Sequence, residues 1–426
     1  MRRKCIYWAL SSALSVFAAA AQMAGMNHQN MNRAGMYLMN MSSGTGLNPY
    51  SWQMPMMMTN TGKWTMMWMG QVFVMDTQQY GPRGGDKFFA PNWGMASAIR
   101  SVGSGSVALT TMLSLDPATV TNRRYPLLFQ TGETAYGKPL TDAQHPHDFL
   151  MGLSVAYARP LNRDTMLQFY YAPVGDPALG PVAFPHRASA FELPQATLGH
   201  HWQDATHIAA NVATVALRHK WLRVEASGFH GTEPDENRWN LDWGPMNSYA
   251  ARVSVAPTSN WMAQVSAGRI TKPERLEEGD IVRTTASLHY TRPLDRGTSW
   301  STSFIWGRNH EIAHQRDVDS FLVETLYPAT RRNFLTARFE AVDKDELFAG
   351  QHDIEHRLGD SAAGTTFRVQ GYTAGYTRDL AVGRGVEAGM GANVTGYRIP
   401  AAIQTYYGEH PWGWNVFLRV RLKSGM

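Results

Sequence analysis

The stretch VEAGMGANVT, residues 386–395, alternates between two kinds of side chain with a period of two. Val386, Met390 and Val394 fall on one side of an extended chain, and Glu387 and Asn393 fall on the other. Successive side chains of a β-strand point to opposite faces, so this stretch predicts a strand with one dry face and one polar face. The same pattern recurs at 222–227, 282–289 and 335–341. It is typical of a transmembrane barrel with lipid outside and water inside, although a soluble sandwich with the reverse geometry has the same period.

The connections between these stretches predict the topology. Short turns are expected at 102–104, 161–164, 218–220, 257–260, 294–297, 330–333 and 381–384. Longer segments are expected at 77–91, 116–148, 174–205, 231–246, 271–280, 310–317, 344–365 and 398–411. Tight turns at one end and long loops at the other are what a transmembrane barrel requires. The predicted fold class is therefore all-β: a transmembrane antiparallel up-and-down β-barrel of about sixteen strands.

The first residues predict export. Arg2, Arg3 and Lys4 precede an apolar stretch at 6–20, and small residues then allow cleavage before Gln22. An uncleaved anchor helix is the alternative. Cys5 is the only cysteine and would leave with the signal, so the mature chain is expected to contain no thiol.

The predicted organisation is a signal peptide at 1–21, a mobile Met/His-rich tail or plug at 22–63, and a barrel at 64–426 in the cell outer membrane. Without the signal, 36 Lys and Arg face 34 Asp and Glu, which is no electrostatic footprint for nucleic acid. No later apolar run approaches 18 residues, so helical membrane spans are not expected. A mean hydropathy of −0.32 with 14 Trp, 17 Tyr and 17 Phe is ordinary for a barrel that is apolar on one side only.

The last predicted strand, 412–423, resembles the C-terminal assembly signal of Gram-negative outer-membrane barrels, but 424–426 follow where a terminal aromatic is usual. The expected partners are therefore outer-membrane lipid and the barrel-assembly machinery. A metal ion is a candidate partner, and a homotrimer is an open alternative.

Charged residues collect on the predicted inner face. The expected pore-lining residues are Arg223, Arg252, Arg283, Arg338, Glu340, Arg368, Arg419 and Arg421. One interpretation is that they pair with one another and stiffen the wall. The other is a selectivity ladder for anions or zwitterions.

Methionine is concentrated near the N-terminus, where 16 of the 23 methionines lie at or before Met95. Thioether and imidazole are ligands that suit copper(I), and thioethers need no deprotonation. The candidate metal ligands in this region are Met26, His28, Met31, Met36, Met39, Met41, Met67 and Met69. Copper is the only candidate cofactor. Packing of an inserted tail, or strand 64–75 in the opposite register, are the alternatives.

Most histidines fall in or beside the predicted long loops. His145, His147 and Asp148 form one candidate site, and His200 and His201 form another. Imidazole with carboxylate suits zinc, copper(II), nickel or iron. Ordinary polar surface is the alternative, because no spacing matches a zinc-hydrolase motif.

Two resemblances add to this interpretation. The tract MNHQNM (26–31) resembles the Met/His-rich N-terminal segments of outer-membrane proteins of copper-resistance systems. The tracts GPRGGDKFF (81–89) and QHPHD (144–148) resemble a group of Gram-negative outer-membrane β-barrel proteins without an assigned role. The first resemblance implies copper handling, and neither implies a particular transport activity.

The leading functional hypothesis is an outer-membrane channel involved in copper or other soft-metal handling. A general or anion-preferring porin with a structural plug is the second hypothesis. A lipid-modifying enzyme is the third: Ser287 and His289 share a strand face, but no nucleophile-elbow or phosphate-loop motif occurs. The sequence therefore predicts a protein that is not an enzyme.

Overall fold

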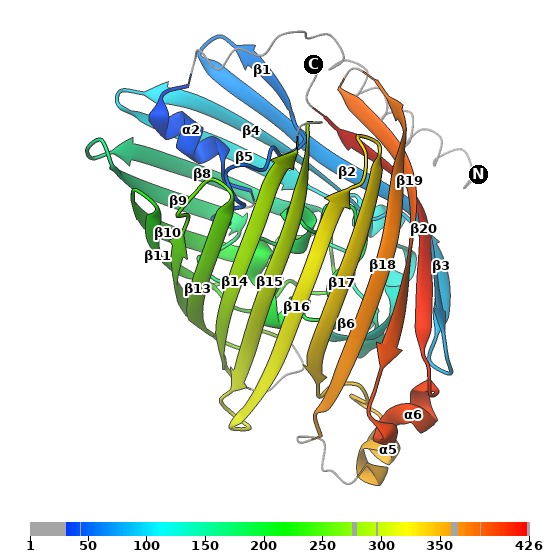
Figure 1. The fold of residues 1–426 in the computed structure, drawn as a ribbon. Helices are drawn as coiled ribbons and strands as arrows, with labels where there is room; N and C mark the ends of the chain where they lie inside the picture. The colour runs from blue at the N-terminus through cyan, green and yellow to red at the C-terminus, as the bar shows by residue number, and fades with distance from the viewer. Residues whose placement is uncertain are drawn as a thin grey trace, which may run out of the picture.

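The main feature of the protein is a closed antiparallel barrel (Figure 1). The computed structural model describes residues 31–42, 44–274, 279–294, 297–358, 365–383 and 385–423. The barrel strands are β2 (Trp64–Tyr80), β4 (Asn92–Val102), β5 (Gly105–Leu113), β8 (Leu150–Pro160), β9 (Thr165–Gly175), β10 (Ala209–His219), β11 (Leu222–His230), β12 (Ser248–Val255), β13 (Trp261–Ile270), β14 (Ile281–Leu294), β15 (Thr298–Glu311), β16 (Arg316–Pro328), β17 (Asn333–Lys344), β18 (Phe367–Val382), β19 (Val386–Arg398) and β20 (Trp412–Leu422). Each pairs with the next, and β20 pairs with β2, where Val72 lies opposite Val420. The predicted sixteen-stranded barrel is confirmed.

Two short strands extend the pairing of β2. β1 (Met57–Thr61) pairs with residues 64–68, and β3 (Gly85–Phe89) pairs with residues 75–79. They bring the sheet to 18 strands without changing the closed ring.

The side chains alternate between the outside and the inside of the barrel. In β19, Met390 and Val394 are each 46% exposed, whereas Glu387 and Asn393 are buried. The same outward face of other strands carries Leu217, Val224, Val253, Val265, Phe304, Val323 and Leu418. A closed barrel with an apolar outer belt is the architecture of proteins that span bacterial outer membranes.

Short turns and longer connections alternate around the barrel, with one departure from the prediction. The sequence predicts a long loop at 310–317, but β15 continues to Glu311 and β16 begins at Arg316. The two strand ends are joined by side-chain ion pairs. Arg308 Nη2 lies 2.8 Å from Asp319 Oδ2, and Arg308 Nη1 lies 3.2 Å from Asp317 Oδ2.

The helices are short and lie in the connections. They include α3 (Asp116–Thr119), η2 (Thr121–Arg123), α5 (His352–Arg357) and α6 (Ala401–Tyr407). In the part of the chain that is described, no helix has the length and apolar character needed to cross a membrane.

Three segments fill the inside of the barrel. The N-terminal segment 31–56 contains α2 (Arg33–Met39), which packs against β4, β5 and β8 (Figure 1). The connection from β5 to β8 forms a hairpin of β6 (Tyr125–Ala135) and β7 (Lys138–Gln144). The connection from β9 to β10, residues 176–208, holds η3 (Phe184–His186), α4 (His200–Gln203) and η4 (Ala205–Ile208). We call residues 176–208 the inserted segment.

The inserted segment makes the lumen largely solid. All of its residues from 176 to 204 are buried. Cavities along it measure about 20–30 Å³, which is room for one or two water molecules. Along the inserted segment the interior is therefore packed by side chains, in contrast to the water-filled interior that the sequence predicts. In the N-terminal region, Tyr37, Leu38, Thr45 and Asn48 are buried among these segments.

Candidate metal sites inside the barrel

The predicted pore-lining arginines point inward, with one exception, but they line no open channel. Arg223, Arg252, Arg283, Arg338, Arg419, Arg421 and Glu340 are all at most 7% exposed. A buried charge needs a partner, since its desolvation is otherwise costly. The partners include carboxylates of the barrel wall, such as Glu225, which lies 2.9 Å from Arg223 Nη2 and 3.0 Å from Arg252 Nε.

The inserted segment supplies further charged partners. Arg187 Nε of this segment lies 2.6 Å from Glu324 Oε1 on β16, and Arg338 Nη2 lies 3.0 Å from the other oxygen of Glu324. Glu192 of the same segment lies 2.6 Å from Arg421 Nη1 and also pairs with Arg419. The ion pairs of Arg187 and Glu192 fasten the inserted segment to β16 and β20, and Arg338 Nη1 on β17 donates a 3.3 Å hydrogen bond to the carbonyl oxygen of Gln195.

The N-terminal segment is fastened in a similar way. Arg223 Nη1 and Arg252 Nη2 donate hydrogen bonds of 2.9 and 2.8 Å to the carbonyl oxygen of Thr45. Tyr37 Oη donates a bond of 2.9 Å to Gln168. The arginines of the inner face therefore pair with wall carboxylates and also bind the filling, and among the described residues they do not form a ladder open to free anions.

Arg368 corrects the prediction, because it lies on the outer face. Its side chain is 45% exposed and pairs with Asp343, whereas Phe367 and Val369 on either side of it are buried. The two apolar residues turn inward because they pack in the cluster that includes Phe348 and Leu347. Where the lumen is filled by packed side chains, apolar residues of the strand face inward and the charged residue faces outward, the opposite of what a water-filled lumen predicts.

The predicted histidines come together inside the barrel, although they are distant in sequence. His145 and His147 follow β7, while His200, His201 and His207 belong to the inserted segment. The ring centroids of His145 and His201 are 6.0 Å apart, and those of His147 and His207 are 5.9 Å apart. His200 lies 5.3 Å from both His201 and His207. Four of the five histidines are at most 8% exposed, so the polar-surface interpretation is wrong for them.

Carboxylates surround this histidine cluster. His200 Nδ1 lies 2.6 Å from Asp204 Oδ1, and His147 Nδ1 lies 3.0 Å from Asp116 Oδ2. Burial is the main cause that lowers the pKa of His207 well below its usual range, and neighbouring His200 adds to the shift. Asp148, which the sequence groups with His145 and His147, instead pairs with Arg238 at 3.4 Å.

His201 has the most acidic surroundings of the cluster. Its Nδ1 lies 3.2 Å from Glu274 Oε1 and 3.6 Å from Glu233 Oε2. Burial alone would lower the pKa of His201, but the two carboxylates outweigh it and raise the pKa to about 10. One ligand atom from each of the three residues lies within 4.8 Å of the others.

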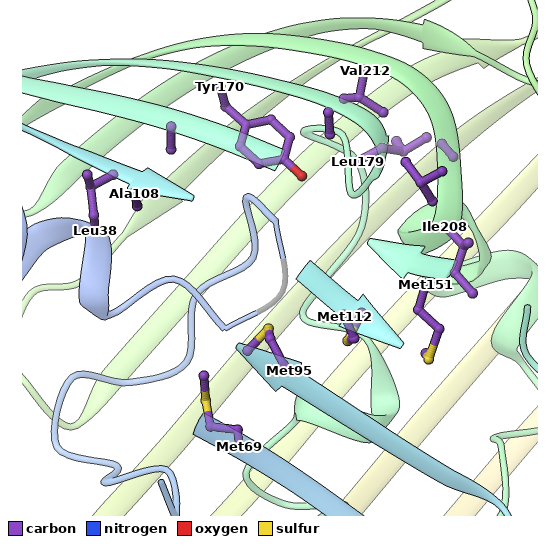
Figure 2. Close-up of a cluster of buried hydrophobic side chains, with 14 of the residues drawn as sticks. Leu38, Met69, Met95, Ala108, Met112, Met151, Tyr170, Leu179, Ile208 and Val212 are labelled. Carbon is purple, nitrogen blue, oxygen red and sulfur yellow. The ribbon is translucent and has the colours of Figure 1, made fainter. Parts of the chain in front are cut away.

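The methionines form a second cluster. Met69 lies opposite Met95, and Met95 lies opposite Met112, on the adjacent strands β2, β4 and β5. All three are buried on the inner face, and Figure 2 shows them in sequence with Met151 beyond. Directly opposite side chains have Cβ atoms about 4.5–5.5 Å apart, so Met69, Met95 and Met112 form a row of neighbouring side chains on the wall.

The remaining predicted methionine ligands are placed around this row. Met67 is buried in the same cluster, and Met31, Met39 and Met41 pack against it, whereas Met36 is 37% exposed. Met26 and His28 lie outside the described residues.

His186 of the inserted segment completes the methionine row. Its Nε2 lies 3.1 Å from Met112 Sδ, and its ring packs on Trp93 at a centroid distance of 4.3 Å. Asn48 of the N-terminal segment donates a 2.9 Å bond to the His186 carbonyl oxygen. His186 Nδ1 has no hydrogen-bond partner among the described residues. Burial lowers the pKa of His186 to about 3, so its imidazole is neutral at physiological pH.

Several residues of these two clusters escape sequence reasoning. Glu233, Glu274 and His186 each stand alone in their segments and carry no motif. His207 does have a signal, because it ends the stretch HHWQDATH at 200–207. Alternation within its own strand predicts that Met112 points inward, but its grouping with Met69 and Met95 depends on the pairing of β2, β4 and β5.

Comparisons with known proteins concern the fold. The sequence matches no protein-family model and no curated protein. Among solved structures, Pseudomonas putida OprB is similar with a TM-score of 0.52 and 9% identity, over 84% of this chain and 94% of that chain. The anion-selective porin from Comamonas acidovorans has a TM-score of 0.49 and 9% identity, over 84% and 99% of the two chains. The outer membrane channel DcaP of Acinetobacter baumannii has a TM-score of 0.49 and 7% identity, over 86% and 99%. At these identities the likeness to OprB demonstrates a shared fold, and the chain is an outer-membrane-type β-barrel.

Proposed function

We propose that this barrel is an outer-membrane channel protein that handles soft metal ions of the copper(I) type. The observation that carries the proposal is the thioether row of Met69, Met95 and Met112, with His186 Nε2 3.1 Å from the sulfur of Met112. Thioether and neutral imidazole together select soft cations, and neither must lose a proton to bind at neutral pH.

The surroundings of the row support a site for a bare cation. The indole ring of Trp93 packs beside His186, and an aromatic face attracts a desolvated cation. The N-terminal segment adds further thioethers from Met39 and Met41 at the edge of the cluster. A cation at this position would have thioethers of both the barrel wall and the N-terminal segment within one cluster.

Silver(I) binding tests the proposal, since silver(I) stands in for copper(I) and needs no reductant. Purified barrel is titrated with Ag⁺, together with a variant in which Met69, Met95 and Met112 are replaced by leucine. Leucine conserves volume, so each replacement is expected to cost less than about 1.5 kcal/mol of stability. We expect the triple variant to bind fewer Ag⁺ ions than the unaltered protein.

The matched control carries Met246→Leu and Met390→Leu, because both methionines are exposed and lie outside the cluster. This variant should bind Ag⁺ as the unaltered protein does. Equal Ag⁺ binding by the triple variant and the control would refute the thioether site.

A general or anion-preferring porin with a structural plug is the second candidate, and the fold favours it. Porin function predicts steady conductance in planar bilayers and Ag⁺ binding that the methionine variants leave unchanged. The homotrimer remains a prediction, to be measured by analytical ultracentrifugation of the detergent-solubilised protein.

A lipid-modifying enzyme remains the third candidate. His289 Nε2 lies 2.9 Å from Ser287 Oγ, but both side chains are buried inside the barrel and the other ring nitrogen contacts Ser303. Turnover of phospholipid by the purified barrel is the measurement that would support this candidate.

A further inference from the structure

A cavity of about 370 Å³ lies among the long connections, between the β6–β7 hairpin and residues 231–247. Its walls carry six carboxylates: Glu133, Glu233, Asp235, Glu236, Asp242 and Glu274. Arg238 and His230 are the basic residues of the lining. A concave surface with an excess of one sign of charge concentrates counter-ions, in this case cations.

Two of these carboxylates, Glu133 and Glu236, are already paired with arginines, whereas Glu233 and Glu274 face His201. Glu133 pairs with Arg238, and Glu236 Oε2 lies 2.9 Å from Arg123 Nη1. Glu274 Oε2 accepts a 2.9 Å hydrogen bond from the backbone N–H of Glu133, which fixes the carboxylate and leaves Oε1 toward His201.

His201 reaches Glu233 and Glu274 from the inner side of the cavity. Its ring is 4% exposed, and neither ring nitrogen makes a hydrogen bond with acceptable geometry to a described residue. Gly132, at φ 106°, gives the ring its space, because a Cβ there would lie 2.7 Å from Cε1 and Nε2 of His201. The local chain is thus shaped around a histidine whose Nδ1 faces two carboxylates and whose Nε2 has no hydrogen-bond partner among the described residues.

We propose that His201, Glu233 and Glu274 bind a divalent cation of the zinc type, which enters through the acidic cavity. One imidazole nitrogen and two carboxylate oxygens suit Zn²⁺ and Co²⁺, whereas soft cations prefer sulfur and hard cations prefer oxygen alone. Three protein ligands also leave a fourth tetrahedral position free for water or for an exchanging ligand. The site differs in chemical class and in location from the methionine row, so it goes beyond the soft-metal function.

Cobalt binding by the full, purified barrel tests this proposal. Co²⁺ is titrated and followed by its visible absorption, in the unaltered protein and in the variant Glu233→Gln with Glu274→Gln. We expect one Co²⁺ per barrel and a loss of affinity of at least about 100-fold in the double variant, since loss of a mere supporting partner already costs about 10–100-fold. The matched control is His219→Asn, at an exposed turn where His219 contacts only Thr165 among the described hydrogen bonds.

The outcomes separate a metal site from a structural ion pair. An ion pair alone predicts no Co²⁺ or Zn²⁺ binding by the unaltered protein, which would overturn the proposal. Unchanged affinity in the folded double variant would overturn it as well. Ag⁺ binding should persist in the double variant, so failure of this site and failure of the methionine site are distinguishable.

X-ray absorption of the zinc-loaded unaltered barrel keeps the proposal testable if the double variant does not fold. We expect a shell of nitrogen and oxygen atoms at about 2.0–2.2 Å with scattering from a single imidazole. Sulfur scattering at about 2.3 Å, or several imidazoles, would place the ion elsewhere and refute the assignment.

Discussion

Glu192 is the residue at which the inserted segment is most simply loosened. Its carboxylate is 1% exposed and pairs with Arg419 and Arg421 of β20. Replacing it with glutamine keeps the volume and removes the charge. We expect Glu192→Gln to shift the inserted segment from its docked position toward a released one, which opens the lumen to ions.

The size of the effect follows from the pairs that remain. Removing one partner of a buried ion pair costs about 3–5 kcal/mol. Both arginines keep Glu387 as a neighbour, 2.9 Å from Arg419 and 2.5 Å from Arg421, so the lower end applies. About 3 kcal/mol corresponds to roughly a hundredfold increase in the released fraction, at 1.4 kcal/mol for each factor of ten.

Single-channel recording in planar bilayers measures this fraction as the open probability. The control is Asp317→Asn, which breaks an exposed pair with Arg308 whose expected worth is only about 0–1 kcal/mol. We expect rare openings for the unaltered protein and the control, and frequent openings for Glu192→Gln. Equal open probability in the two variants would refute the fastening role of Glu192, and constant conductance of the unaltered protein would refute an occluded lumen.

Three further predictions follow from the placement of single residues. Arg368→Glu should leave the reversal potential of any open state unchanged in a salt gradient, because Arg368 lies on the outer face; a clear shift toward cations would contradict this placement. Burial, with the charge of His201 as the next cause, lowers the pKa of His145 to about 4, so its unfolded form takes up a proton first as the pH falls. The free energy of unfolding, measured by urea titration, should therefore decrease as the pH falls from about 6.5 to 4. His145→Phe should make this decrease smaller. With the long connections outside the cell and the short turns in the periplasm, cysteine at exposed Asn237 should react with an impermeant thiol reagent on intact cells, whereas cysteine at Asn162 should react only after the outer membrane is opened; equal labelling would refute this orientation.

The wall of the barrel could be predicted from the sequence, because lipid imposes a strict rule on every second residue. That rule identifies the strands, their number, and the inward direction of residues such as Arg338 and Met69. The rule fails at Arg368, because the inner face of this part of β18 packs against an aromatic cluster and not against water.

The filling could not be predicted in the same way, because it has no repeating pattern. The inserted segment is held by individual hydrogen bonds and ion pairs to distant strands. One example is the 2.6 Å hydrogen bond that the backbone N–H of Leu198 donates to Glu340. The histidine pairs are visible in the sequence, but their grouping depends on two connections meeting inside the barrel. Glu233 and Glu274 join His201 only through that meeting.

The fastening of the inserted segment constrains the order in which the protein can fold. Glu192 and its partners Arg419 and Arg421 are separated by 227 and 229 residues, and the partners lie on the strand that also closes the ring against β2. Residues 176–208 are made long before β20 is available, and a ring closed without them would have to admit the whole segment afterwards through one end. The interior and the last seam of the barrel are therefore expected to form in a single concerted step. A β20 that arrives late would leave a charged segment unpaired at the open edge of the sheet.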